Sequence, residues 1–276
     1  MALQLRDLWG GALPETRLHP SPKWIRATVG DRVVVDSRAA LLVWEPRRVV
    51  PSYAVPVGDI AAELVPYTGA EVEERPVPLG LVDQPVLDPS TPFLAHSTPG
   101  RPLTVRLTEG ELPGAAFAAD DPDLAGYVVL DWNSFTEWLE EEESVAGHPR
   151  DPFDRIDCLR SSRRVVVSLD GVTLADSSRP TLLFETPLPT RYYLPREDVA
   201  MELLRPSEFR SVCAYKGRAR YWSAEVGGRV VKNVAWSYEE PRHDALPVRD
   251  MVAFFTERLD LTLDGVALER PLTPWS

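Results

Sequence analysis

Hydrophobic and polar residues alternate on both sides of Gly227-Gly228, and this pattern predicts a β-hairpin. Two glycines between alternating runs supply the positive φ angles that a two-residue hairpin turn needs. Counting outward from the turn predicts the cross-strand partners: Val226 with Arg229, Tyr221 with Val234, and Ala219 with Trp236.

Side chains alternate between the two faces of a strand, so this register also predicts two faces. One face carries small and aromatic residues, and we expect it to form a concave aromatic patch: Ala219, Tyr221, Val234, Trp236 and Tyr238. The other face is mixed and is expected to be partly exposed: Arg218, Arg220, Trp222, Ala235 and Ser237. A slip by one residue would exchange the faces.

The order of elements recurs about 140 residues apart, which indicates a repeated unit. Each copy has an alternating hairpin, then an apolar strand, then an aspartate expected to begin a short helix. The matched residues are Asp36 with Asp176, Ser37 with Ser177, Glu45 with Glu185, Tyr53 with Tyr193, and Asp59 with Asp198.

We therefore predict a mainly β fold with a few short helices, arranged as two tandem domains. The predicted segments are an N-terminal arm at 1–22, a first repeat at 23–146, a linker at 147–160 and a second repeat at 161–276. The first repeat is expected to be degenerate, because it has His96 to Gly100 opposite Cys213 to Gly217, and Phe117 opposite Trp236.

Composition narrows the class of protein. The 276 residues are 44% hydrophobic and contain no run of about 18 apolar residues, so no membrane segment is expected. The first residues lack the features of a secretory signal, and we expect a cytoplasmic protein. The net charge of −12 argues against nucleic acid as a partner. The two cysteines, Cys158 and Cys213, form no paired motif, so neither a disulfide framework nor a structural zinc site is expected. We expect no cofactor.

The best site candidates lie in the second repeat. Trp236 is either the wall of a ligand pocket or an ordinary core residue. Cys213 is either a nucleophile helped by Lys216 or a small buried side chain. Lys216 is either solvated or in contact with a ligand anion or with Glu185.

A buried carboxylate at Glu185 needs a partner, and Arg191 is the nearest candidate along the chain. Tyr192 and Tyr193 must face opposite ways on a strand, and Tyr193 is expected to line the site because its counterpart is Tyr53. The set of expected ligand-binding residues is therefore Glu185, Arg191, Tyr193, Cys213, Lys216, Tyr221, Trp236 and Tyr238.

The second repeat resembles the bacterial family called domain of unknown function 427. The match is carried by Asp170-Gly171, Asp176-Ser177, Leu183-Phe184-Glu185, Tyr192 to Pro195, Cys213 to Gly217, Tyr221-Trp222 and Ala235 to Tyr238. The resemblance implies a β-tent-like fold of antiparallel sheets with a pocket between them, in the tandem form of the family. Some classifications label the family nucleotidyltransferase-like, but this sequence has no Gly-rich phosphate loop.

These observations favour a protein that binds a small, partly apolar molecule in an aromatic pocket of the second repeat. Two alternatives remain. Cys213 and Lys216 could serve a thiol-dependent enzyme, with Lys216 favouring the thiolate. The chain could instead be a protein-interaction module without a pocket.

Overall fold

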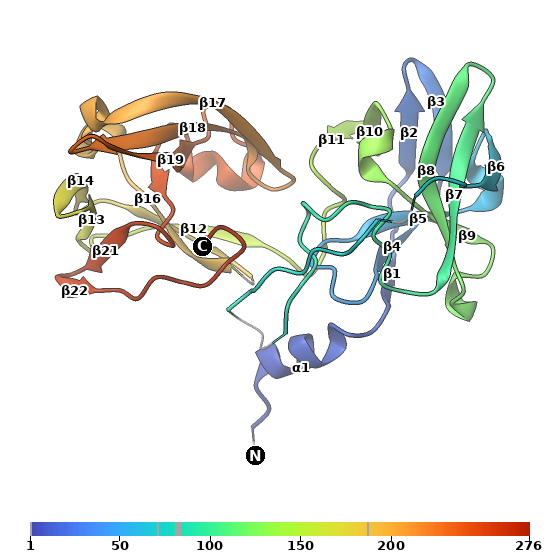
Figure 1. Ribbon diagram of the computed structural model, residues 1–276, viewed down its shortest axis with the longest axis horizontal. Helices are drawn as coiled ribbons and strands as arrows, with labels where there is room; N and C mark the ends of the chain where they lie inside the picture. Colours follow the sequence, from blue (N-terminus) through green and yellow to red (C-terminus); the bar gives the residue numbers. More distant parts are fainter. Residues whose placement is uncertain (1, 71, 81–83, 187) are drawn as a thin grey trace. The chain divides into compact units, whose positions relative to one another are not determined.

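The structure is a computed structural model that describes residues 2–70, 72–80, 84–186 and 188–276. The chain divides into two compact units, Met1–Asp151 and Pro152–Ser276. The described strands form five antiparallel sheets, which confirms the predicted mainly β fold (Figure 1). Each unit is described below by itself.

The first unit contains two sheets and begins with α1, Leu5–Ala12. The larger sheet has, in spatial order, β1 (Arg17–Pro20), β4 (Leu41–Trp44), β5 (Ser52–Pro56), β9 (Tyr127–Leu130), β8 (Gly110–Ala119), β7 (Gly100–Leu107) and β6 (Glu63–Pro66). The smaller has β11 (Glu143–Val145), β10 (Glu137–Glu140), β2 (Ile25–Val29) and β3 (Arg32–Ser37).

The second unit contains three sheets. The first has β12 (Ile156–Arg160), β15 (Thr181–Glu185) and β16 (Leu188–Tyr193). The second has β14 (Val172–Ser177), β13 (Val165–Leu169), β21 (Asp260–Leu263) and β22 (Val266–Ala267). The third has β17 (Leu204–Cys213), β18 (Gly217–Val226), β19 (Arg229–Ser237) and β20 (Ala253–Phe254), of which β17 to β19 lie side by side in orange in Figure 1.

The two units share one strand order. In the first unit β5 pairs with β9 and joins its strands into one large sheet. In the second unit a single bridge between Leu194 and Val252 stands at the corresponding place, so the same strands form two sheets.

The unit boundaries differ from the expected segments. Residues 17–20, expected in an extended arm, form β1 and pair with β4. The expected linker at 147–160 ends in β12, which pairs with β15 inside the second unit. Each of these short strands lies at the edge of a sheet. Backbone hydrogen bonds to the neighbouring strand hold it there, although its apolar pattern in the sequence is weak.

Asp59 and Asp198 end single 3-10 turns instead of beginning helices, and the short helix expected after Asp198 is one further 3-10 turn at Met201–Leu203. Instead of capping a helix, Asp59 accepts a hydrogen bond from Ser37 (2.6 Å) and Asp198 accepts one from Ser177 (2.7 Å). The 3-10 helices are η1 (Val57–Asp59), η2 (Pro122–Leu124), η3 (Trp132–Ser134), η4 (Arg196–Asp198), η5 (Met201–Leu203) and η6 (His243–Val248). Within the described part of the chain, every helix is too short or too polar to cross a bilayer.

Candidate functional site

The hairpin of β18 and β19 turns at Gly227-Gly228 as predicted. Val226 pairs with Arg229, and the two glycines have φ angles of 56° and 81°. Further along, Tyr221 pairs with Trp236, so the predicted pairing with Val234 is wrong. A bulge shifts the register at this point, where Asn233 has a positive φ of 53° and its N–H donates to Ser223 Oγ (3.2 Å).

The bulge also changes which side chains share a face. Ala219, Tyr221, Trp236 and Tyr238 pack together as expected, but Val234 packs into the other core of the unit. The other face is partly exposed, as predicted: Arg218 and Arg220 are exposed, whereas Trp222, Ala235 and Ser237 are at most 4% exposed.

The aromatic cluster is defined by Tyr193, Tyr221, Trp236, Tyr238 and Phe255. Trp236 Nε1 donates to the hydroxyl of Tyr193 (3.0 Å), and the two rings meet edge to face with centroids 6.2 Å apart. Phe255 lies 4.5 Å from Trp236 between ring centroids. The expected concave patch is thus a packed core whose rings contact one another.

A buried ion pair borders the aromatic cluster. The turn between β17 and β18 is made of Ala214, Tyr215 and Lys216, and all three are buried, although hairpin turns usually face solvent. Lys216 Nζ contacts the carboxylate of Glu185 at the end of β15. The expected alternative of a contact between Lys216 and Glu185 is confirmed.

Backbone contacts fix the position of Lys216. The N–H of Arg242 donates to the carbonyl of Lys216 (3.2 Å). Gly217, with a φ of 96°, passes so close to the carbonyl of Glu240 that an added Cβ would lie 3.2 Å from that oxygen. Glycine at 217 is therefore required by both its φ angle and its surroundings.

Charge and burial act together on Lys216. Burial lowers the pKa of this lysine, whereas Glu185, Cys213 and Tyr193 raise it, and the net shift is upward. Burial raises the pKa values of Tyr193 and Tyr238, so both hydroxyls stay protonated at neutral pH. The site thus holds an ammonium next to neutral hydroxyl groups.

Both cysteines lie at this site, partly buried. Cys213 is the last residue of β17 and pairs with Gly217, and Ala214 separates it from Tyr215 along the chain. Cys158, which lies in the expected linker, packs against the aromatic cluster from β12, and burial raises the pKa of its thiol more than Lys216 lowers it. The alternation of Ile156 and Cys158 was the signal in the sequence for this strand.

The predicted ion pair between Glu185 and Arg191 is wrong. Arg191 forms a two-pronged ion pair with Glu257, at 2.8 and 2.6 Å, and the side chains are 5% and 0% exposed. A register shift on β15 between Leu183 and Glu185 separates Glu185 from Arg191, which pairs with Leu183. Burial raises the pKa of Glu257, but Arg191 lowers it more and the net shift is downward.

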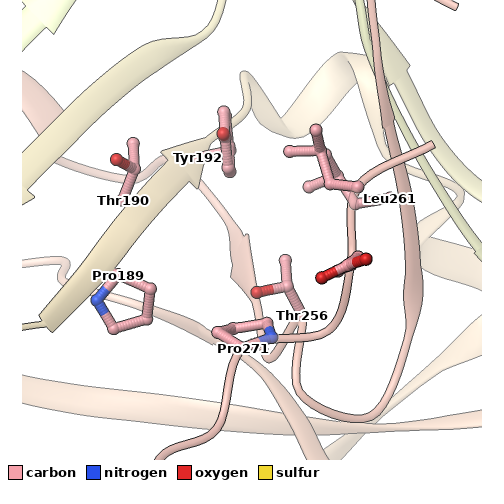
Figure 2. Close-up of a pocket in the computed structure, with 8 residues that line it drawn as sticks. Pro189, Thr190, Tyr192, Thr256, Leu261 and Pro271 are labelled. Carbon is pink, nitrogen blue, oxygen red and sulfur yellow. The ribbon is translucent and has the colours of Figure 1, made fainter. Parts of the chain in front are cut away.

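Tyr192 and Tyr193 face opposite ways, as predicted. Tyr193 is fully buried in the aromatic cluster, whereas Tyr192 lines a cavity of about 150 Å³ (Figure 2). None of the expected ligand-binding residues lines this cavity, whose walls are Pro189, Thr190, Tyr192, Thr256, Leu261, Leu268, Glu269 and Pro271.

The first unit carries a different arrangement at the corresponding place. Glu45, directly after β4, is 3% exposed. Its carboxylate contacts His96 Nδ1 at 3.0 Å and accepts a hydrogen bond from the N–H of Ser97 at 2.8 Å. His96 stacks on Phe117 with ring centroids 3.6 Å apart. Among the described residues, neither unit contains three His, Cys, Asp or Glu side chains grouped to hold a metal.

Comparison with known proteins finds a family match within the second unit. Residues 157–265 match the family described as a domain of unknown function, DUF427. No curated protein matches the chain. The matched segment contains Glu185, Cys213, Lys216 and Trp236, and it confirms the resemblance drawn from these residues.

Proposed function

We propose that the second unit, which is a DUF427 domain, binds a small, partly apolar molecule beside Lys216. The buried ion pair of Lys216 and Glu185 carries the proposal. A buried ion pair contributes little to stability once desolvation is counted, so stability alone gives a weak reason to keep one. Buried ionisable groups with shifted pKa values gather at functional sites.

The ligand would use both the charge and the rings of this site. The ammonium of Lys216 has three N–H donors, and Glu185 accepts one of them. A carboxylate or carbonyl oxygen of the ligand would accept another, and its apolar part would reach Tyr193 and Tyr238 only after the packed cluster opens, because these rings are 0% and 4% exposed. The indole N–H of Trp236 is already donated to Tyr193, so Trp236 would contribute its ring.

We further infer that the first unit is a diverged copy of the same domain. The shared strand order supports this inference, as do the matching contacts of Ser37 with Asp59 and of Ser177 with Asp198. Among the described residues of the first unit, the buried glutamate has His96, Ser97 and Arg48 beside it, and no lysine. Ligand binding is therefore assigned to the second unit alone.

A thermal-shift screen with small metabolites and cyclic imides tests the proposal. Ligand at a hundredfold excess over Kd stabilises by about 2.7 kcal/mol, which is easily detected. The test variant is Lys216→Met with Glu185→Leu, since removing both charges leaves no unpaired buried ion. The matched control is His96→Gln in the first unit.

We expect a compound that stabilises the wild type and the His96→Gln chain but leaves the melting temperature of the double variant unchanged. A compound that shifts all three chains equally would bind elsewhere and contradict the proposal. A broad library without any active compound would also count against it.

A second candidate function rests on Cys213. This thiol is partly exposed and lies close enough to Lys216 for an electrostatic interaction. An adjacent ammonium favours the nucleophilic thiolate, and Cys213 could then add to an electrophilic carbon of a substrate while a tyrosine hydroxyl supplies the proton. Mass spectrometry after brief iodoacetamide treatment would show fast labelling of Cys213 that slows in Lys216→Met. An inert Cys213 excludes this function.

A further inference from the structure

Residues 268–276, here called the strap, cover the ion pair of Arg191 and Glu257. The hydroxyl of Thr273 donates to Glu257 Oε1 (2.7 Å), and Thr273 is 2% exposed. Trp275 places its ring 5.4 Å from the guanidinium carbon of Arg191. The strap therefore supplies one contact to each member of the buried ion pair.

Three rings surround the guanidinium of Arg191. Trp236 and Phe255 lie 5.5 and 5.7 Å from its central carbon, and both belong to the aromatic cluster. Trp275 of the strap completes the set and lies 5.9 Å from Phe255 between ring centroids. The rest of the unit thus offers the strap a hydrogen-bond acceptor in Glu257, a cation in Arg191 and two aromatic rings.

The strap segment that enters this site holds its own shape. Within residues 273–276, the N–H of Thr273 donates to Ser276 Oγ (2.9 Å), and the N–H of Ser276 donates back to the carbonyl of Thr273 (3.1 Å). The N–H of Trp275 donates to Thr273 Oγ1 (3.2 Å). A short segment that is preorganised in this way loses little entropy on binding.

From these contacts we propose that Arg191, Trp236, Phe255 and Glu257 form a peptide-recognition site. Its ligand is a segment with a hydroxyl residue two positions before a tryptophan, and the strap occupies it in this structure as an internal ligand. The hydroxyl satisfies the Glu257 carboxylate, and the indole packs on the Arg191 guanidinium. A partner segment of the same chemistry would displace the strap. This site shares the Trp236 ring with the proposed binding site beside Lys216, but its ion pair of Arg191 and Glu257 is separate from that of Lys216 and Glu185.

The test uses the strap itself as a peptide, Leu-Glu-Arg-Pro-Leu-Thr-Pro-Trp-Ser, with a fluorescent label, and measures anisotropy. Two chains offer an open site: one that ends at Ala267, and the full chain with Thr273→Val and Trp275→Ala. The full double variant keeps the test valid if truncation prevents folding, which circular dichroism would show. The control peptide carries the same Thr→Val and Trp→Ala changes.

We expect the peptide to bind both open chains and to bind the wild-type chain about tenfold or more weakly, because an attached segment competes at an effective concentration on the order of mM. The control peptide should not bind, and Arg191→Met with Glu257→Leu in the open full chain should abolish binding. Folded open chains that fail to bind the peptide would overturn the proposal. So would a wild-type chain that binds it equally well.

Discussion

The two units bury a glutamate at the same point of the fold but satisfy it differently. In the first unit Glu45 contacts an imidazole and a backbone N–H, and the guanidinium of Arg48 lies 3.7 Å away. In the second unit Glu185 contacts the ammonium of Lys216. The buried glutamate therefore belongs to the shared fold, whereas its partner distinguishes the two units.

The difference bears on what each site can exchange. The backbone N–H of Ser97 cannot leave Glu45 without moving the chain, and the imidazole of His96 is held by its stacking on Phe117. The ammonium of Lys216 ends a flexible side chain and can turn a donor toward another oxygen. We therefore propose that a ligand oxygen reaches the charged pair of the second unit more easily than the buried glutamate of the first.

The largest effect is expected from removing one charge of the second site. Lys216→Met leaves Glu185 buried without its partner and should cost about 3 to 5 kcal/mol of the free energy of unfolding. Adding Glu185→Leu should restore most of the loss, because no charge then remains buried. Urea denaturation followed by circular dichroism measures both. A double variant as unstable as the single one would mean that the pair itself stabilises the fold.

The corresponding change in the first unit should cost less. His96→Phe keeps a flat ring on Phe117 and removes one contact to Glu45, while Ser97 and Arg48 remain beside that carboxylate. We expect a loss of about 1.5 to 3 kcal/mol, the range for one hydrogen bond to a charged group. A loss greater than that of Lys216→Met in the same urea experiment would reverse the contrast between the units.

Acid should weaken the second unit through Glu257. Burial raises the pKa of Glu257, but the hydrogen bonds and charge of Arg191 lower it more. The pKa in the folded chain therefore lies below its ordinary value of 4.5. The stability that this carboxylate contributes is complete above pH 4.5 and is lost as the pH falls through its folded pKa. Below pH 4.5, the free energy of unfolding of the wild type should therefore fall relative to that of the double variant Arg191→Met with Glu257→Leu. A constant difference from pH 6 to about pH 3 would contradict this linkage.

The smallest effect is expected inside the aromatic cluster. Trp236→Phe keeps an aromatic ring but removes the hydrogen bond to the hydroxyl of Tyr193. We expect a loss of about 1 kcal/mol, typical of one neutral hydrogen bond, plus a small packing term. Thermal unfolding monitored by circular dichroism measures it, with Trp222→Phe as a control on the opposite face. A much larger loss for Trp236→Phe would show that this bond organises the cluster.

Local patterns in the sequence were sufficient for much of the fold. The glycine pair at 227–228 fixed the hairpin turn, and alternation separated Tyr192 from Tyr193. The bulge at Asn233 was not predictable, because a positive φ at an asparagine leaves no mark in the alternation on either side. It moved Val234 to the other core.

The partners of the buried charges were harder to predict than their burial. Arg191 and Glu257 are 66 residues apart, and only the three-dimensional arrangement brings them together. Glu185 was the expected ion-pair partner of Arg191 because the two are close along the chain. The register shift on β15 places Arg191 opposite Leu183 instead, so this ion pair does not form. The contact of Lys216 with Glu185 was foreseen as one of several alternatives, since the sequence does not show that the whole turn is buried.

Hydrogen–deuterium exchange, with the compound that gives the largest thermal shift, tests most directly whether ligand binding belongs to the Lys216 site of the second unit. The turn at Ala214 to Gly217 and the end of β15 should become protected on addition of the compound, while the backbone around His96 and Ser97 should exchange unchanged. Protection that appears around His96, or in neither place, would contradict the assignment of binding to Lys216 and Glu185.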